Sequence, residues 1–285
     1  MKQRTITAVV AALIFLPIVM LGDVIFQAFV YLIASIAIYE LMRMKKIARY
    51  SIASVITLLL MWTLMYNQGM FGGYNVPITK SELTLLAVLI LLSYTVLVKN
   101  RFTFDDVGFL LLSAIYIGMG FYYLIVTREE GLQFIFYALF VVWATDTGAY
   151  IFGRLFGKHK LWPQISPKKT IEGSIGGVVL ACVVAYVFHT IEPFSHSLFI
   201  VLIVTIIISI AGQIGDLVES ALKRHYAVKD SGKILPGHGG VLDRFDSLIF
   251  MLPILHLIGF IPEEESALIN LQTMEWVLSI VSYIG

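Results

Sequence analysis

The feature that most constrains this chain is a succession of apolar runs, each close to the length that crosses a lipid bilayer. A transmembrane helix needs about 20 mostly apolar residues, and nine runs approach that length. They cover residues 6–21, 24–42, 51–66, 83–98, 107–126, 132–153, 173–191, 197–222 and 246–262. Charges, Gly or Pro bound each run, as is usual at helix ends. The runs predict an all-α, polytopic integral membrane protein with about nine transmembrane helices.

The composition excludes a soluble globule. Hydrophobic residues make up 59% of the 285 residues and charged residues only 14%, whereas an ordinary soluble domain has about 25% charged residues. So few charges could not cover a surface in contact with water, and disorder would need the opposite composition. The single cysteine, Cys182, excludes an internal disulfide framework and a Cys-rich metal site. The net charge of +1 and the aromatic residues show no nucleic-acid-binding pattern.

The distribution of Lys and Arg predicts the orientation, because short cytoplasmic loops carry an excess of these residues. With the N-terminus inside, 18 of the 20 Lys and Arg residues fall in inside segments, and only Lys80 and Arg128 fall outside. The split predicts a multi-pass protein of the cell (inner) membrane with a cytoplasmic N-terminus. The two longest inside loops, 154–172 and 223–245, place the predicted active site on the cytoplasmic side.

The predicted spans form two groups. Residues 1–130 hold about five spans, and residues 131–262 hold about four spans together with both long loops. The first two runs are joined only by Gly22 and Asp23, which predicts a tight helical hairpin. The tail 263–285 begins with three glutamates and continues with an interrupted apolar stretch. An amphipathic interfacial helix is the first interpretation of this tail, and a tenth span is the second.

The densest polar segment begins inside the end of the eighth run. Asp216, Glu219, Ser220 and Lys223 stand at i, i+3, i+4 and i+7, which share one helical face. Acidic side chains this deep in an apolar run are costly unless they are paired or bound to a cation. They are therefore functional candidates. The alternative is a helix end whose local ion pairs reach into water.

Beyond this helix end, glycines alternate with cations and carboxylates. Glycine lets backbone amides approach an anion closely, and Lys and Arg neutralise it. Carboxylates here would repel phosphate unless a divalent cation lay between them, and Mg²⁺ takes one or two carboxylates plus phosphate oxygens. The segment therefore predicts a metal–polyphosphate site with Asp216 and Asp243 as ligands. Asp246 is a third candidate ligand, with capping of the ninth helix as its alternative role.

The same segment resembles the signature of the phosphatidate cytidylyltransferases, also called CDP-diacylglycerol synthases. That signature has S-x-apolar-K-R, four residues, K-D, a small residue, a P-x-H-G-G turn and then D-R-x-D, and this chain fills every fixed place. The resemblance extends upstream to residues 215–216, 166–170 and 146–149. It covers roughly the C-terminal half of the chain.

This resemblance implies a homodimeric membrane enzyme that uses CTP and Mg²⁺, with the number of metal ions left open. The implied reaction transfers a cytidylyl group from CTP to phosphatidate and gives CDP-diacylglycerol and pyrophosphate for phospholipid biosynthesis. The catalytic candidates are Asp216, Asp243, Lys223, Arg224 and Lys229. The candidates for substrate binding are Lys168, Lys169, Ser220, His238, Gly239, Gly240 and Arg244.

Several interpretations stay open at this point. Lys168 and Lys169 also fit a simple topology signal, and Asp146 fits either a hydrogen-bond hub or a ligand that reaches the site. Glu40, near Arg43, fits a structural role. A CTP-using lipid kinase and a transporter are the alternative functions. A transporter predicts ionisable residues near several span midpoints, whereas the charges here gather in two loops.

Overall fold

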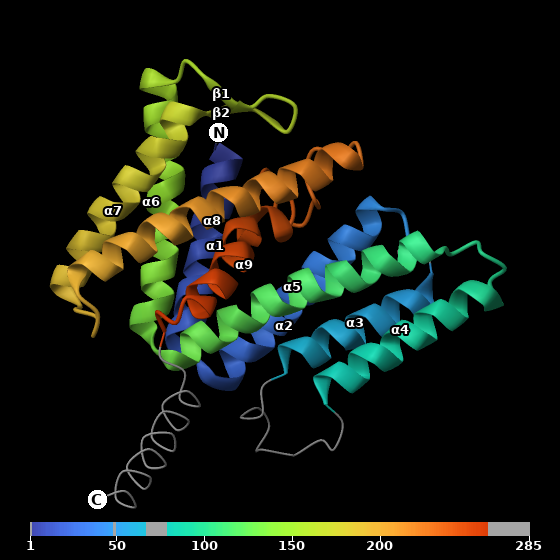
Figure 1. Ribbon diagram of the computed structural model, residues 1–285. Helices are drawn as coiled ribbons and strands as arrows, with labels where there is room; N and C mark the ends of the chain where they lie inside the picture. Colours follow the sequence, from blue (N-terminus) through green and yellow to red (C-terminus); the bar gives the residue numbers. More distant parts are fainter. Residues whose placement is uncertain (1, 48–49, 67–78, 262–285) are drawn as a thin grey trace, which may run out of the picture.

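The computed structural model describes residues 2–47, 50–66 and 79–261. The predicted helix or span at 263–285 lies outside these residues. The described helices are α1 (Lys2–Leu21), α2 (Asp23–Met44), α3 (Ser51–Met65), α4 (Lys80–Leu97), α5 (Phe104–Glu130), α6 (Leu132–Phe156), α7 (Ile171–Ile191), α8 (Leu198–His225) and α9 (Leu242–Leu257). Two short strands, β1 (Lys160–Trp162) and β2 (Ser166–Thr170), pair antiparallel between α6 and α7 (Figure 1).

The prediction of a helical membrane protein is confirmed in its main feature, since each predicted apolar run corresponds to one helix. Six of the described helices, namely α2 and α4 to α8, are long and apolar enough to cross a membrane. The apolar parts of α1 and α3 are shorter, and α9 has 16 residues. Length and composition therefore support six spans within the described residues, compared with the predicted nine or so.

The hairpin in the 154–172 loop is a difference from the all-α prediction. Its base is closed by Glu172, whose carboxylate accepts the backbone N–H of Lys158 at 3.1 Å and that of His159 at 3.2 Å. Thr170 ends β2 and caps α7, because its Oγ accepts the N–H of Gly173 at 3.1 Å. The hairpin thus ends directly at the start of a helix.

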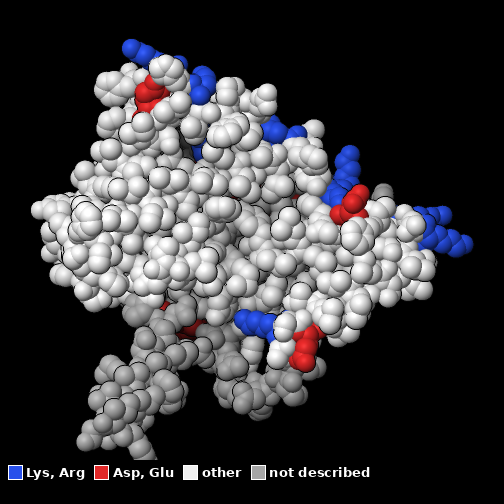
Figure 2. Space-filling view, in the orientation of Figure 1, with Lys and Arg blue, Asp and Glu red and all other residues white. Residues whose placement is uncertain are grey.

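Consecutive helices run back and forth across the molecule. Figure 1 shows the N-terminus, the β-hairpin and the connection between α8 and α9 toward one edge, and the turn between α1 and α2 toward the opposite edge. Figure 2 shows Lys and Arg concentrated along the first of these edges, a broad band of uncharged residues, and a small group of charges along the second. A protein embedded in a membrane needs two water-facing sides separated by a belt of apolar surface, and the charges are distributed in this way.

The tight hairpin predicted at Gly22 is confirmed, because α1 ends at Leu21 and α2 begins at Asp23. Gly22 has φ 69°, a left-handed conformation that glycine adopts without strain. Arg128 of α5 donates hydrogen bonds to the carbonyls of Val19 and Met20 at the end of α1. One of the two cations on the predicted outer side therefore holds the first turn of the chain against α5.

Glycines bring the helices of the C-terminal half close together. A Cβ at Gly148 of α6 would lie 2.7 Å from the carbonyl oxygen of Gly176 of α7. A Cβ at Gly215 of α8 would lie 2.6 Å from the carbonyl oxygen of Asp246 of α9. Small residues permit such close approach of helix backbones. The second contact brings the polar end of α8 beside the start of α9.

Candidate active site

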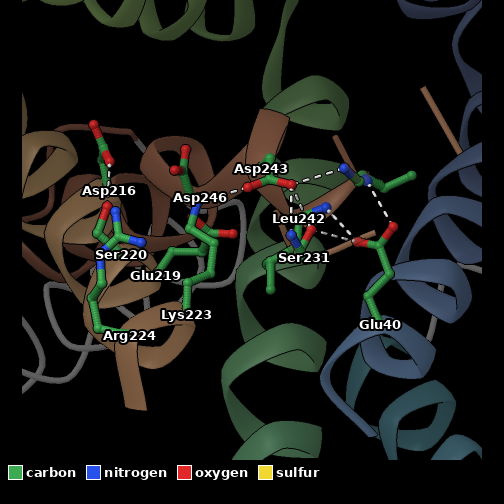
Figure 3. A network of polar contacts seen from close by, with 12 residues as sticks. Glu40, Asp216, Glu219, Ser220, Lys223, Arg224, Ser231, Leu242, Asp243 and Asp246 are labelled. Atoms are coloured by element: carbon green, nitrogen blue, oxygen red, sulfur yellow. Dashed lines mark hydrogen bonds and ion pairs between the residues drawn. The ribbon is translucent and has the colours of Figure 1, made fainter. Parts of the chain in front are cut away.

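The predicted residues meet where the hairpin, the end of α8, residues 226–241 and the start of α9 come together. We call residues 226–241 the glycine loop. Figure 3 shows Asp243 between Glu40 on one side and Asp216 on the other. The side chains form two groups, one around Asp243 and one around Asp216, and they differ in how their charges are neutralised.

Asp243 is the centre of the first group. Its Oδ1 accepts a hydrogen bond from Lys223 Nζ at 2.6 Å. Its Oδ2 accepts the N–H of Ser231 at 2.8 Å, the hydroxyl of Ser231 at 2.9 Å and the N–H of Gly240 at 2.8 Å. The side chain is 5% exposed, so this carboxylate is held almost entirely by protein donors. It fixes the glycine loop to the end of α8.

Lys223 also pairs with Glu219, one turn earlier on α8. The Glu219 side chain is fully buried, at 0% exposure, so a single ammonium lies between two carboxylates. A lysine has three donors, and two of them are directed at these acids. Sequence reasoning placed Glu219 on the right helical face but gave it no role, and the structure makes it a partner of Lys223.

Asp216 is the centre of the second group. Its Oδ2 lies 2.5 Å from Lys169 Nζ of β2, and its Oδ1 accepts the hydroxyl of Ser220 at 3.3 Å. A predicted metal ligand and a predicted phosphate contact therefore neutralise each other across the hairpin. Lys168, the neighbouring residue of the strand, is exposed. The hairpin is also held by Arg224, whose Nε donates to the carbonyl of Ile165 at 3.2 Å.

Asp246 does not cap α9, because the helix begins four residues earlier, at Leu242. The capping interpretation of Asp246 is therefore wrong. Its Oδ1 accepts the N–H of Ser247 at 2.7 Å, one turn inside the helix. Asp146 of α6 and Asp216 of α8 lie close enough for their charges to act on Asp246. Acidic residues from three helices therefore influence the charge of one another in this region.

This second group has the donor chemistry that Mg²⁺ prefers, which is carboxylate oxygen. As they stand, the described residues contain no cluster of three or more His, Cys, Asp or Glu that could hold a metal ion. Asp216 and Asp246 carry like charges that a cation between them would neutralise. Asp243 is a less direct metal ligand, because protein donors already occupy both of its oxygens. It would have to give up its bond with Lys223 or with a loop amide before it could bind a metal ion. The residues thus fit a cation better at Asp216 and Asp246 than at Asp243.

The glycine loop lines an open cavity of about 590 Å³, which is within the usual range for small-molecule sites. Gly237 and Gly239 have φ 78° and 85°, so the turn uses the left-handed conformation that glycine permits. The turn is closed by hydrogen bonds from Leu235 N to the Gly239 carbonyl at 3.0 Å and from His238 N to the Leu235 carbonyl at 2.9 Å. The lining residues are Lys229, Asp230, Gly232, Lys233, Leu235, Pro236, Gly237, His238, Gly239 and Arg244.

The charges of this cavity favour an anion, since three cations outnumber the single acid among the lining residues. Of the predicted site residues, Lys229, His238, Gly239 and Arg244 line this cavity, whereas Lys223 and Arg224 do not. His238 Nδ1 is buried without a hydrogen-bond partner among the described residues. The backbone N–H of Gly240 does not face a ligand in the cavity, because it donates to Asp243.

Glu40 of α2 is the site residue that sequence reasoning missed. It is 2% exposed and accepts the N–H of Val241 and of Leu242, both at 3.0 Å. It also accepts the hydroxyl of Ser231 at 2.9 Å. The sequence predicted a structural role for Glu40 near its neighbour Arg43. The partners that the structure shows lie some two hundred residues further along the chain. An acidic residue inside an apolar run was the signal that could have found it.

Comparison with known proteins agrees with this geometry. The cytidylyltransferase family pattern matches residues 2–261, so the chain belongs to that family. The phosphatidate cytidylyltransferase of Bacillus subtilis (strain 168) is 52% identical over 90% of this chain and 97% of its own length. The enzyme of the same name from Staphylococcus haemolyticus is 52% identical over 90% and 98%, and that of Staphylococcus aureus (strain COL) is 48% identical over the same shares. The family match includes the N-terminal helices, whereas the resemblance found in the sequence covered only about the C-terminal half.

Proposed function

We propose that this protein transfers a cytidylyl group from CTP to phosphatidate, giving CDP-diacylglycerol and pyrophosphate for phospholipid biosynthesis. The observation that carries the proposal is the cationic glycine-loop cavity at the ends of apolar helices, where water-soluble CTP and a membrane lipid can meet. About half of the residues are identical to those of phosphatidate cytidylyltransferases across 90% of the chain, which supports the same substrates.

The reaction requires little proton chemistry from the protein. Phosphatidate is a phosphate monoester, and such groups are largely ionised at pH 7. One of its oxygens bonds to the α-phosphorus of CTP, the bond from that phosphorus to the β-phosphate oxygen breaks, and pyrophosphate leaves with the electron pair. The main barrier is repulsion between two anions. Catalysis is then positioning and charge neutralisation, as is usual for transfer at phosphorus.

The residues of the cavity match these tasks. Lys229 and Arg244 neutralise the triphosphate, and His238 donates or accepts a hydrogen bond through its buried ring nitrogen. Lys223 lies outside the cavity lining; it is oriented by Asp243 and Glu219 and adds positive charge near the bound phosphates. Lys169 at the hairpin is placed to exchange Asp216 for a phosphate group, either of the lipid or of CTP.

Asp216 and Asp246 are the residues we propose as holders of Mg²⁺, with Asp243 able to join after exchange of a donor, and one or two ions fit this proposal. Magnesium, when bound, supplies positive charge that stabilises the phosphate oxygens and the departing pyrophosphate. The charge of Asp146 acts on both Asp216 and Asp246, and it adds to the negative charge that favours a cation there. Ser220 orients Asp216 through its hydroxyl.

The membrane arrangement belongs to the same proposal. We propose about nine crossings of the inner membrane, with the N-terminus and the site in the cytoplasm. The basic edge in Figure 2 supports this orientation. The acyl chains of phosphatidate stay among the helices, while CTP enters from water. A homodimer, and the division into residues 1–130 and 131–262, remain predictions from the sequence.

Incubation of the purified protein with labelled CTP and Mg²⁺ tests this function. Phosphatidate should yield a labelled lipid and pyrophosphate in equal amounts. A polyprenol should yield no phosphorylated lipid. Product from the alcohol alone would indicate a lipid kinase, and the absence of any CTP-derived lipid would contradict the proposed reaction.

A further inference from the structure

We propose that Glu40 is a positioning residue that holds the glycine loop in its CTP-binding shape, an inference that rests on the proposed function. Glu40 lies on α2, far from the signature segment in sequence, and it lines neither the cavity nor the carboxylate group around Asp216. Its influence on the reaction therefore has to pass through the loop.

Glu40 caps the start of α9. The first N–H groups of a helix have no partner within the helix, and Val241, the residue before α9, has no side-chain oxygen that could cap it. Glu40 accepts the N–H of Val241 and of Leu242, each at 3.0 Å. A carboxylate from another helix thus caps α9, where negative charge is favourable.

A chain of contacts runs from Glu40 to the centre of the site. The hydroxyl of Ser231 lies 2.9 Å from Glu40 Oε2 and 2.9 Å from Asp243 Oδ2. Asp243 in turn holds Lys223 at 2.6 Å. Glu40 and Asp243 therefore both accept hydrogen bonds from the glycine loop, and they lie on opposite sides of Ser231 (Figure 3). Movement of Glu40 would break its hydrogen bond with Ser231. Because Ser231 also holds Asp243, and Asp243 holds Lys223, the Lys223 side chain would change direction.

Packing against Glu40 explains two glycines of the signature. A Cβ added at Gly232 or at Gly240 would overlap the Glu40 carboxylate. Neither glycine has a positive φ, so space and not backbone conformation is what requires glycine there. The close packing of the loop backbone on Glu40 indicates that the loop and this side chain are built to fit each other.

The experiment measures initial rates against CTP and against phosphatidate for Glu40→Gln, Gly232→Ala and the double variant Glu40→Asp with Gly232→Ala. Glu40→Gln keeps the size of the side chain but replaces one carboxylate oxygen with an NH₂ group. That group would face the N–H and hydroxyl donors of the loop, and a donor cannot accept their hydrogen bonds. We expect it to raise KM for CTP by about tenfold with little change in KM for phosphatidate. Gly232→Ala should do the same. In the double variant the shorter acid makes room for the methyl group, so its KM for CTP should fall below that of Gly232→Ala alone.

Glu192→Gln, at an exposed glutamate after α7, is the matched control and should leave both KM values unchanged. A second measurement does not depend on activity: trypsin should cleave after Lys229 and Lys233 faster in Glu40→Gln than in the unmodified protein or the control. Unchanged KM for CTP together with unchanged cleavage would overturn the proposal. If the unmodified protein formed no CTP-derived lipid, the proposed function would fail, and the rate of cleavage alone would still decide whether Glu40 holds the loop.

Discussion

Lys223 and Asp243 lie 2.6 Å apart, nitrogen to oxygen, although one lies in the last turn of α8 and the other in the first turn of α9. The pair fixes the angle at which the two helices meet and closes the glycine loop between them. Glu219 lies on the other side of the same ammonium. The centre of the site is therefore an ion triad that joins α8 to α9, and the proposed function gives its lysine a part in the reaction as well.

Lys223→Ala should reduce both activity and stability. The substitution leaves Glu219, which has no exposed surface, and Asp243 without their cation, and breaking a buried pair costs about 3–5 kcal/mol. The sequence alone predicts loss of activity without unfolding, and the structure changes this expectation. Thermal unfolding in detergent and turnover with CTP measure the two effects. A variant with full stability and full turnover would show that the triad is not required.

Asp216→Asn should raise the Mg²⁺ concentration needed for half-maximal rate while leaving the fold intact. The side chain is 31% exposed, and its partners among the residues that the structure describes are Lys169 and Ser220, so loss of its charge affects cation binding more than packing. Asp243→Asn is the contrasting variant. It should lower stability as well, because Asp243 accepts four hydrogen bonds. A normal Mg²⁺ titration for Asp216→Asn would remove it from the proposed metal site.

Lys229→Ala should weaken CTP binding without destabilising the protein. Lys229 is exposed and lines the glycine-loop cavity, and loss of a charged hydrogen bond is worth about 1.5–3 kcal/mol, which is roughly a tenfold to hundredfold rise in KM for CTP. Arg224→Ala is the matched comparison, since Arg224 holds the hairpin through Ile165 and lies away from the cavity lining. A larger effect of Arg224→Ala on KM for CTP would reverse the two assignments.

Cysteines placed at Lys160 and Lys233 test the predicted orientation in a Cys182→Ser background. An impermeant maleimide added to intact cells should leave both unlabelled and should label them after permeabilisation. Lys80→Cys, on the side predicted to face outward, is the positive control and should react at once. Reaction at position 233 in intact cells would place the glycine loop on the wrong side for cytoplasmic CTP.

Apolar run length was enough to predict the helices, because a backbone buried in lipid has to satisfy its hydrogen bonds within the helix. The hairpin was not predicted, since its strands of three and five residues have no apolar alternation. The signature segment identified the residues of the site but not their partners. Whether Asp243 binds a metal ion or a lysine depends on how α8 packs on α9. No local sequence pattern specifies that packing.

The capping of α9 by Glu40 has a consequence for how the protein is made. The acid enters the membrane with α2, and its partner Ser231 is 191 residues further along the chain. At about 5–20 residues per second, synthesis of that stretch takes about 10–40 s. During this time a carboxylate destined for burial has no partner, and a chain that stops before α9 never supplies one. Release of such truncated chains should therefore yield proteins that quality-control proteases remove, even though most of their helices are complete.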